Sequence, residues 1–104
     1  MPQFDVYKNA NRATAREVPY LLDVQSDLLE PLSTRVVVPL VAIKAIKKPL
    51  SNLNPLFQID GHQVVLSTAE LAAIPSNHLG PAIANLASAR STIIGALDFL
   101  FTGI

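Results

Sequence analysis

The side chains best suited to acid–base chemistry in this chain are few and lie far apart. His62 and His78 are its only histidines. His62 stands beside a predicted turn, and His78 stands in a loop bounded by proline and glycine. A histidine in such a place is usually solvated, and it lacks the neighbouring group that tunes a catalytic imidazole. We expect neither histidine to act as an acid or a base.

A second candidate is the carboxylate pair Asp23 and Asp27. In an extended segment, residues four apart lie on one face about 13 Å from each other. That distance is too long for two carboxylates to share a proton or to work together on one bond. We therefore interpret both residues as solvated acids at the end of a strand.

Other catalytic and ligand-binding patterns are also missing from the sequence. The four glycines are scattered at positions 61, 80, 95 and 103, so no glycine-rich phosphate loop exists. There is no cysteine to form a thiolate or a disulfide, and no histidine or acid spacing typical of a metal site. The sequence predicts a protein that is not an enzyme and that needs no metal or cofactor.

The charges balance overall but not locally. Eight basic and eight acidic residues cancel, which argues against direct nonspecific binding to nucleic acid, because such binding needs clustered positive charge. Arg35, Lys44, Lys47 and Lys48 nevertheless make residues 35–48 basic. We interpret this segment as a solvated loop and strand edge; the alternative is a docking patch for an acidic partner.

The length and the hydropathy pattern favour one folded domain over residues 1–104. The N-terminal residues have no apolar stretch of the kind a signal peptide requires. The longest uncharged run, residues 71–89, is interrupted by two prolines and by polar residues, so no membrane span is predicted. Together with the lack of cysteine, these features predict a cytoplasmic location without membrane partners.

The first three quarters of the chain read as strands. Alternating or continuous apolar residues predict strands over 3–8, 19–26, 34–43, 56–59 and 63–67. Residues 68–75 fit either a short helix or a final strand, and we favour a strand that ends at Pro75. Asp60-Gly61 between two of the strands is a strong hairpin signal, and residues 9–17 are polar and predict a mobile connection. Pro39 cannot donate to a strand ladder, so it predicts an edge or a bulge.

From Pro81 onward the apolar period becomes helical. The spacing of the apolar residues predicts one helix over 81–102, about 33 Å long, with proline in its first turn. The residues that carry this spacing are Ile83, Leu86, Ala87, Ile94, Leu97 and Phe101. Gly103 fits the position that follows a helix, where a left-handed backbone is common.

Two places in the chain carry apolar residues where a surface is expected. The last helical turn holds Phe99, Leu100 and Phe101, which point in directions about 100° apart and cannot all enter one small core. Leu28 and Leu29 follow a predicted turn at Ser26-Asp27, and one of these two leucines is expected to enter the core. Part of this apolar surface is therefore expected to form a dimer seam or a partner site.

Several sequence blocks, in this order and spacing, resemble the CcdB family of bacterial toxins. The blocks are Leu22-Asp-Val-Gln-Ser-Asp-Leu-Leu29, Arg35-Val-Val-Val-Pro-Leu40, Ala73-Ile-Pro75 and Leu100-Phe-Thr-Gly-Ile104. The resemblance implies a mainly β fold: an SH3-like barrel of antiparallel strands with a long C-terminal α-helix, assembled as a homodimer. It also implies a toxin that binds the A subunit of DNA gyrase and traps the gyrase–DNA cleavage complex. A CcdA-like antitoxin would neutralise it.

The resemblance also implies which residues bind gyrase. Matched position by position, the family's contacts fall on Leu28, Leu29, Asp98, Phe101, Thr102, Gly103 and Ile104. Thr102 stands where the best-known family pattern has tryptophan, and Asp98 stands where asparagine is common. Threonine cannot stack on a guanidinium as an indole does, so this ending departs from the family at a position where an aromatic ring is expected.

Two other functions are compatible with the sequence. One is an endoribonuclease of the MazF type, a toxin family that resembles this one in its barrel; Arg35, Lys44, Lys47 and Lys48 would then face RNA. The other is a homologue that still binds an antitoxin but no longer poisons gyrase. The reason to consider it is Thr102, which stands where the family has tryptophan.

Overall fold

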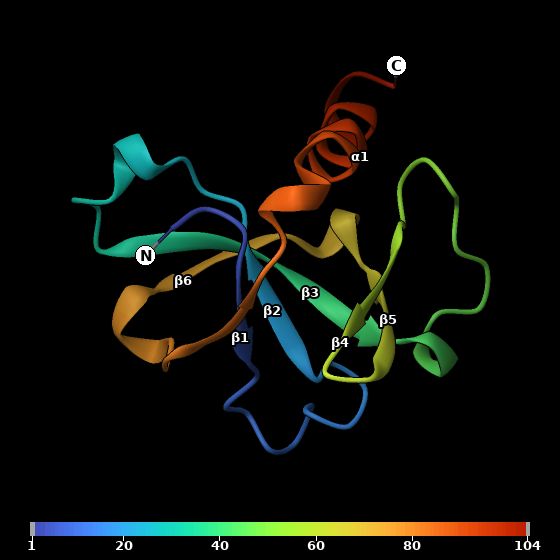
Figure 1. Cartoon of the computed structure of the whole chain (residues 1–104), viewed down its shortest axis with the longest axis horizontal. Helices are drawn as coiled ribbons and strands as arrows, with labels where there is room; N and C mark the ends of the chain where they lie inside the picture. The colour runs from blue at the N-terminus through green and yellow to red at the C-terminus, as the bar shows by residue number, and fades with distance from the viewer. Residues whose placement is uncertain (1, 104) are drawn as a thin grey trace.

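The chain folds into one curled antiparallel sheet with a single α-helix packed across it (Figure 1). The computed structural model describes residues 2–103. The strands are β1 (Asp5–Lys8), β2 (Tyr20–Asp23), β3 (Thr34–Ala42), β4 (Leu56–Ile59), β5 (His62–Leu66), β6 (Ala72–Pro75) and β7 (Ala82–Asn85). The helix is α1 (Arg90–Thr102), and short 3₁₀ turns are η1 (Asp27–Leu29), η2 (Ile43–Ala45), η3 (Thr68–Glu70), η4 (Ser76–His78) and η5 (Ala87–Ala89).

The sheet is a half-barrel in which every strand pair is antiparallel. Its order is β4-β5-β3-β2-β1-β7, and β6 pairs with the first half of β3. Strand β3 is the longest strand, with nine residues, and it contacts three others. The predicted fold class, mainly β with a C-terminal helix, is confirmed for one chain.

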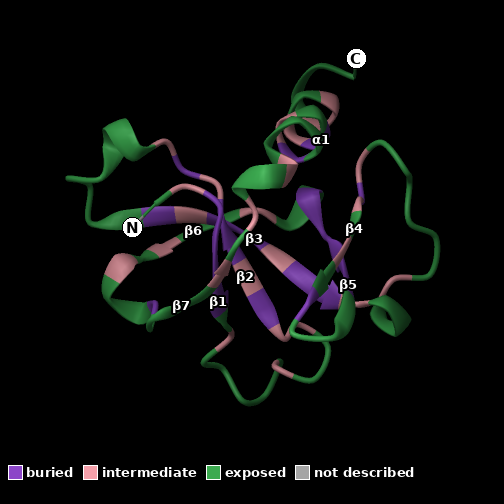
Figure 2. Ribbon diagram, viewed as in Figure 1, coloured by how far each residue is buried: buried purple, intermediate pink, exposed green. Residues whose placement is uncertain are grey.

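The larger hydrophobic core lies between the concave side of the sheet and α1. Side chains alternate along a strand, so every second residue of β1, β2 and β3 points to this side. Val6, Leu22 and Val38 are fully buried there, and Ile93 and Ala96 of α1 pack against the same cluster. Figure 2 shows the buried segments concentrated at the centre of the sheet, beneath the helix.

The opposite side of the sheet holds a smaller cluster of mixed character. Tyr7, Val37 and Leu79 are buried together there. Asp23 and Arg35 belong to the strands that carry this face and are also buried. A charged pair is thus enclosed on the side of the sheet away from α1.

The hairpin predicted at Asp60-Gly61 is confirmed. Ile59 pairs with His62, so the loop has two residues. Asp60 and Gly61 have φ values of 51° and 79°, the left-handed pair that a tight hairpin turn requires because its twist matches that of the strands. The predicted range 34–43 agrees with β3 to within one residue, and the predicted strand end at Pro75 is that of β6. The start of that last strand is wrong, because Thr68–Glu70 form the turn η3 and β6 begins only at Ala72.

The hairpin turn gives the first testable expectation. Gly61→Ala should lower the free energy of unfolding by about 1 kcal/mol, because an added Cβ is disfavoured at positive φ. The added methyl would meet no atom within 4 Å, so the effect isolates the backbone. Urea denaturation measures it, and Gly80→Ala is the matched control, since Gly80 has equally open space without a positive φ. Equal stability of the two variants would contradict the turn assignment.

Pro39 lies in an inner strand, so the prediction of a sheet edge at this residue is wrong. Pro39 pairs with Leu21 of β2, and its carbonyl accepts a hydrogen bond from the Ser67 N–H at 2.9 Å. Its backbone therefore faces the other side of β3, where the neighbouring strand changes from β6 to β5. A missing N–H is tolerated on that side because neither β6 nor β5 pairs with Pro39.

The predicted helix over 81–102 has 22 residues whereas α1 has 13, and its N-terminal part is wrong. Residues Ala82–Asn85 form β7, which pairs with β1, and α1 begins only at Arg90. Ile83 fits the helical spacing by coincidence, and it is exposed. Pairing with the open edge of β1 outweighs the helical preference of the two alanines in this short run. The helix, about 20 Å long at 1.5 Å per residue, does not cross the whole sheet.

Candidate functional site

The turn η1 presents two leucines to solvent. Leu28 is 90% exposed and Leu29 is 47% exposed. Ser26 caps the turn: its Oγ accepts a hydrogen bond from the Leu28 N–H at 3.2 Å, and its carbonyl accepts one from the Leu29 N–H at 3.0 Å. No residue of η1 is buried, so the expectation that one of the two leucines enters the core is wrong. Local hydrogen bonds to Ser26 therefore stabilise an apolar turn that lies outside the core.

The last turn of α1 presents a second apolar side chain. Ile93 and Ala96 are buried against the sheet, whereas Phe99 and Leu100 are half-buried. Phe101 is 70% exposed. The prediction that the last turn carries more apolar surface than one chain can bury is confirmed by this residue.

The helix ends in the conformation predicted for Gly103. This glycine has φ 75°, and its N–H donates to the Phe99 carbonyl at 2.9 Å. The Thr102 Oγ1–H donates to the Asp98 carbonyl at 2.7 Å. The Asp98 side chain is exposed, and no basic residue lies in the last turn to offset its charge at the negative end of the helix dipole. The predicted contact Ile104 lies outside the described residues.

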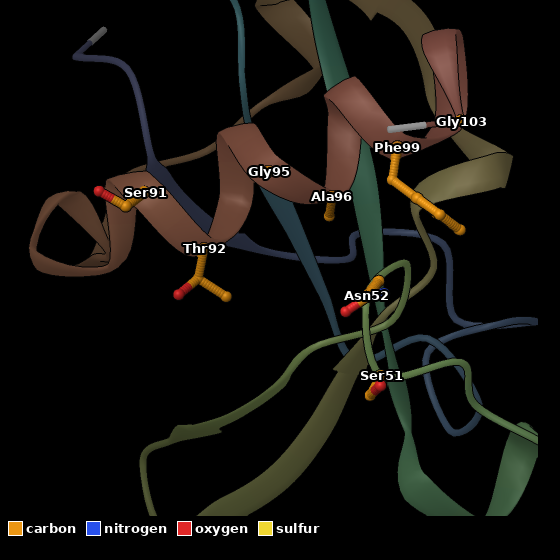
Figure 3. Close-up of a pocket in the computed structure, with 8 residues that line it drawn as sticks. All are labelled: Ser51, Asn52, Ser91, Thr92, Gly95, Ala96, Phe99 and Gly103. Carbon is orange, nitrogen blue, oxygen red and sulfur yellow. The ribbon is translucent and has the colours of Figure 1, made fainter.

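A groove of about 580 Å³ runs beside α1, between the helix and the loop that precedes β4. Figure 3 shows Thr92, Ala96 and Phe99 pointing from the helix toward Asn52 of that loop. Gly95 and Gly103 also line the groove, and because glycine has no side chain, neither residue fills it. The groove adjoins the exposed last turn and extends the surface on which a partner could rest.

The two exposed apolar segments, η1 and the last turn of α1, lie apart from each other in the structure. Figure 1 shows η1 and α1 projecting from the same end of the sheet, with a space between η1 and the last turn of the helix. The structure thus brings Asp98, Phe101, Thr102 and Gly103 together on one turn and leaves Leu28 and Leu29 on another. Both groups are exposed, as a binding role requires.

Two charged residues are placed differently from the prediction. Asp23 is fully buried rather than solvated, and Arg35, expected in a solvated basic segment, is 1% exposed. The Arg35 Nε–H donates to Asp23 Oδ2 at 2.8 Å, and Arg35 Nη2 lies 2.8 Å from the same oxygen. Burial raises the pKa of Asp23, and the Gln25 N–H and Arg35 act in the opposite direction. The pair is internal, so it cannot bind a partner.

Tyr7 beside this pair gives a pH-dependent expectation. Burial, together with the charges of Asp5 and Asp23, raises its pKa to about 12. Because this pKa exceeds that of the unfolded chain, near 10, the folded state favours the neutral phenol. The resulting stability is present below pH 10 and is lost between pH 10 and about 12. Denaturation at stepped pH should show this decline in the wild type and a smaller one in Tyr7→Phe; equal declines would contradict the assignment.

The two histidines are both exposed, as predicted. His62 has a long contact, 3.5 Å, between its Nδ1 and the Tyr20 hydroxyl. Within residues 2–103, no group of three histidine or acidic side chains has the geometry to hold a metal ion. In the same part of the chain, no helix is long and apolar enough to cross a membrane.

Sequence reasoning missed a set of polar contacts that joins η1 to α1. Gln3 and Arg90 carry these contacts, together with Phe4, whose φ of 72° is unusual for a bulky residue. No sequence signal marks them, because a positive φ at phenylalanine contradicts local preference. Only the Ser26-Asp27 turn signal lay near this network.

The sequence was also compared with models of protein families. The model of the family described as CcdB protein matches residues 3–103, which include β1, η1, the whole sheet and α1. The match extends to both exposed apolar segments. The chain therefore belongs to the CcdB protein family, the toxins of toxin–antitoxin systems.

Proposed function

We propose that this protein binds the A subunit of DNA gyrase, traps the gyrase–DNA cleavage complex and is neutralised by a CcdA-like antitoxin. The observation that carries the proposal is the exposure of Phe101 on the last turn of α1, in a chain matched to the CcdB family over residues 3–103. The activity is binding rather than catalysis, so the toxin contributes surface and charge.

Each exposed segment supplies a different kind of contact. Phe101 offers a large apolar ring, and Leu28 and Leu29 add branched apolar side chains. Buried aromatic anchors dominate the energy of many interfaces. Asp98 adds a negative charge at the C-terminal end of α1, where the helix dipole disfavours it. A partner with positive charge would relieve this cost and would orient the toxin.

Thr102 changes the way the end of α1 binds. Its hydroxyl donates to the Asp98 carbonyl and therefore turns back toward the helix. It cannot provide the stacking that the family tryptophan offers. Affinity must then come from Phe101 and from the backbone around Gly103, which places more of the binding energy on one ring.

We further propose that the active form is a homodimer. The support is the apolar surface left on α1 and the groove beside it, which one chain does not fill. Light scattering across a range of protein concentrations should give twice the mass of the chain. A monomer at micromolar concentration would contradict this part of the proposal.

One of the four basic residues that a ribonuclease of this kind would use to face RNA is not available. Arg35 is enclosed in an ion pair with Asp23 and cannot face RNA. Lys44, Lys47 and Lys48 remain exposed, but no acid–base group accompanies them in the segment. The alternative of an antitoxin-binding homologue without poisoning is decided by growth: arrest on induced expression, rescued by the antitoxin, would exclude it.

The direct test uses purified gyrase, ATP and supercoiled plasmid. Adding the toxin should produce linear DNA after the protein is denatured, because the trapped complex holds both strands cut. Omitting ATP or gyrase provides the controls. If gyrase from the natural host yields no linear product, the proposed function is wrong.

A substitution of Leu28 tests whether η1 belongs to the gyrase-binding surface. Leu28→Ser should weaken gyrase poisoning by about tenfold, since the lost apolar contact amounts to about 1–2 kcal/mol. The free energy of unfolding should stay within about 0.5 kcal/mol, as is usual for exposed positions. The measurement is the toxin concentration that gives half-maximal cleavage. Leu50→Ser is a control, because Leu50 is exposed in another loop; equal loss in both variants would remove η1 from the binding surface.

A further inference from the structure

Gln3 connects η1 to the start of α1 through all of its polar groups. Its backbone N–H donates to Asp27 Oδ1 at 2.7 Å, and its side-chain Nε2 donates to the Val24 carbonyl at 3.1 Å. Its Oε1 accepts a hydrogen bond from Arg90 Nη1 at 3.1 Å, and its carbonyl accepts one from Asn85 Nδ2 at 3.3 Å. One half-buried residue therefore contacts Val24, which follows β2, as well as η1, β7 and α1.

Phe4 holds Gln3 in this position. It has φ 72° and is 2% exposed. Its N–H donates to the Asp23 carbonyl at 2.7 Å, and its carbonyl accepts from the Leu86 N–H at 2.8 Å. A strained backbone of this kind persists only where the surroundings determine it, and such places are common at functional sites. The Arg90 guanidinium also lies over the Phe4 ring, 5.7 Å from its centroid, so Arg90 contacts both residues.

Few hydrogen bonds fix the direction of the turn η1, and one of them comes from the buried Gln25. Its Nε2 donates to the Leu29 carbonyl at 3.1 Å, and its Oε1 accepts from the Val36 N–H of β3 at 2.9 Å. None of the η1 residues is buried, so packing does not hold the turn. The Ser26 cap shapes the turn but lies within the same segment. The hydrogen bond from the Gln3 N–H to Asp27 ties η1 to another part of the chain. Beyond Gln3, the rigid helix α1 begins at Arg90 and carries Phe101.

We infer that Gln3 is a positioning residue for partner binding: through Asp27 and Arg90 it fixes the orientation of η1 relative to α1. The inference rests on the proposed function in one respect, since it takes Leu28 and Phe101 to meet the same partner. Gln3 itself need not touch that partner. Its role is to reduce the freedom of η1 before binding, which lowers the entropy that ordering the turn would otherwise cost.

The test is a double-variant comparison at the two ends of the connection. Asp27→Ala and Arg90→Met should each raise the toxin concentration for half-maximal gyrase cleavage by about tenfold, as expected for losing a charge-assisted hydrogen bond. Their combination should be little worse than either alone, because breaking one end already disconnects η1 from α1. If the two effects multiply to about a hundredfold, the residues act independently and the inference is wrong.

Matched controls separate this effect from general damage. Arg12→Met removes a guanidinium from an exposed part of the connection between β1 and β2, and it should leave cleavage unchanged. Gln3→Ala should weaken cleavage, whereas Gln58→Ala, at an exposed glutamine of β4, should not. The combined exchange Gln3→Lys and Arg90→Glu rebuilds an ion pair across the same gap and should restore most of the lost activity. Failure of that rescue, with the melting temperature preserved, would contradict a positioning role.

Amide hydrogen exchange tests the inference without gyrase. In the toxin alone, Arg90→Met should speed exchange at the Leu28 and Leu29 amides by about tenfold, since local opening becomes easier while the core stays protected. Unchanged exchange at these amides overturns the inference. If wild-type toxin gives no cleavage but the exchange result holds, the proposed function fails and the connection through Gln3 stands.

Discussion

Phe101→Ala is expected to weaken gyrase poisoning by roughly 30- to 1000-fold, the loss typical of a central aromatic anchor worth about 2–4 kcal/mol. Phe101 is 70% exposed, so the folded chain gains little from its ring. The free energy of unfolding should therefore change by no more than about 0.5 kcal/mol. The large expected effect follows from Thr102, which leaves Phe101 as the one aromatic ring exposed on the last turn of α1 among the described residues.

The measurement is the toxin concentration for half-maximal cleavage of plasmid by gyrase, with urea denaturation as the companion. Leu56→Ala is the matched control, because Leu56 is also an exposed apolar residue but lies on β4. Thr102→Trp adds a complementary arm: restoring the family's aromatic residue should strengthen poisoning and lessen the dependence on Phe101. A Phe101→Ala variant that poisons gyrase as well as the wild type would move the binding surface away from α1.

Removing one partner of the buried ion pair should have the largest effect on stability. Arg35→Met leaves Asp23 charged and enclosed, and such a change typically costs about 3–5 kcal/mol. Folded domains are stable by only about 5–15 kcal/mol, so this variant should lose a large part of its stability. Urea denaturation at neutral pH measures the loss.

The double variant Asp23→Leu with Arg35→Met should recover much of that loss. Burial raises the pKa of Asp23 even though Arg35 lies 2.8 Å away. The enclosure therefore disfavours the charged carboxylate by more than its partners favour it, so removing both charges avoids a cost that removing one does not. A double variant no more stable than Arg35→Met would show that the pair stabilises the fold in its own right.

Local signals in the sequence account for the features that were predicted well. Asp60-Gly61 specifies its turn because both residues tolerate positive φ, and the strand at Thr34–Ala42 is recognisable from its continuous apolar residues. Geometry predicted that part of the last helical turn stays exposed, since three adjacent bulky residues on a helix cannot share one face. It did not predict that the exposed residue is Phe101, which fits the apolar helical spacing. These inferences need no knowledge of distant parts of the chain.

The misplaced features depend on contacts between distant residues. Ala82–Asn85 forms a strand only because β1 offers an open edge some 77 residues away, and nothing local distinguishes it from a helical start. Arg35 is buried because Asp23 on the neighbouring strand pairs with it. The conformation of Phe4 depends on β2 and on Leu86. The candidate contacts on η1 and α1 were thus predictable, whereas the residues that orient them were not.

The pairing of β7 with β1 also sets the order in which the protein matures during translation. Val6 pairs with Ala84, so β1 has no partner on that side until almost the whole sheet has left the ribosome. Pairings between such distant residues form slowly, because a long loop must close first. Gln3 can meet Arg90 only after this closure. A nascent or truncated chain would therefore display neither segment correctly, and the toxin would become active late, in one final step of assembly.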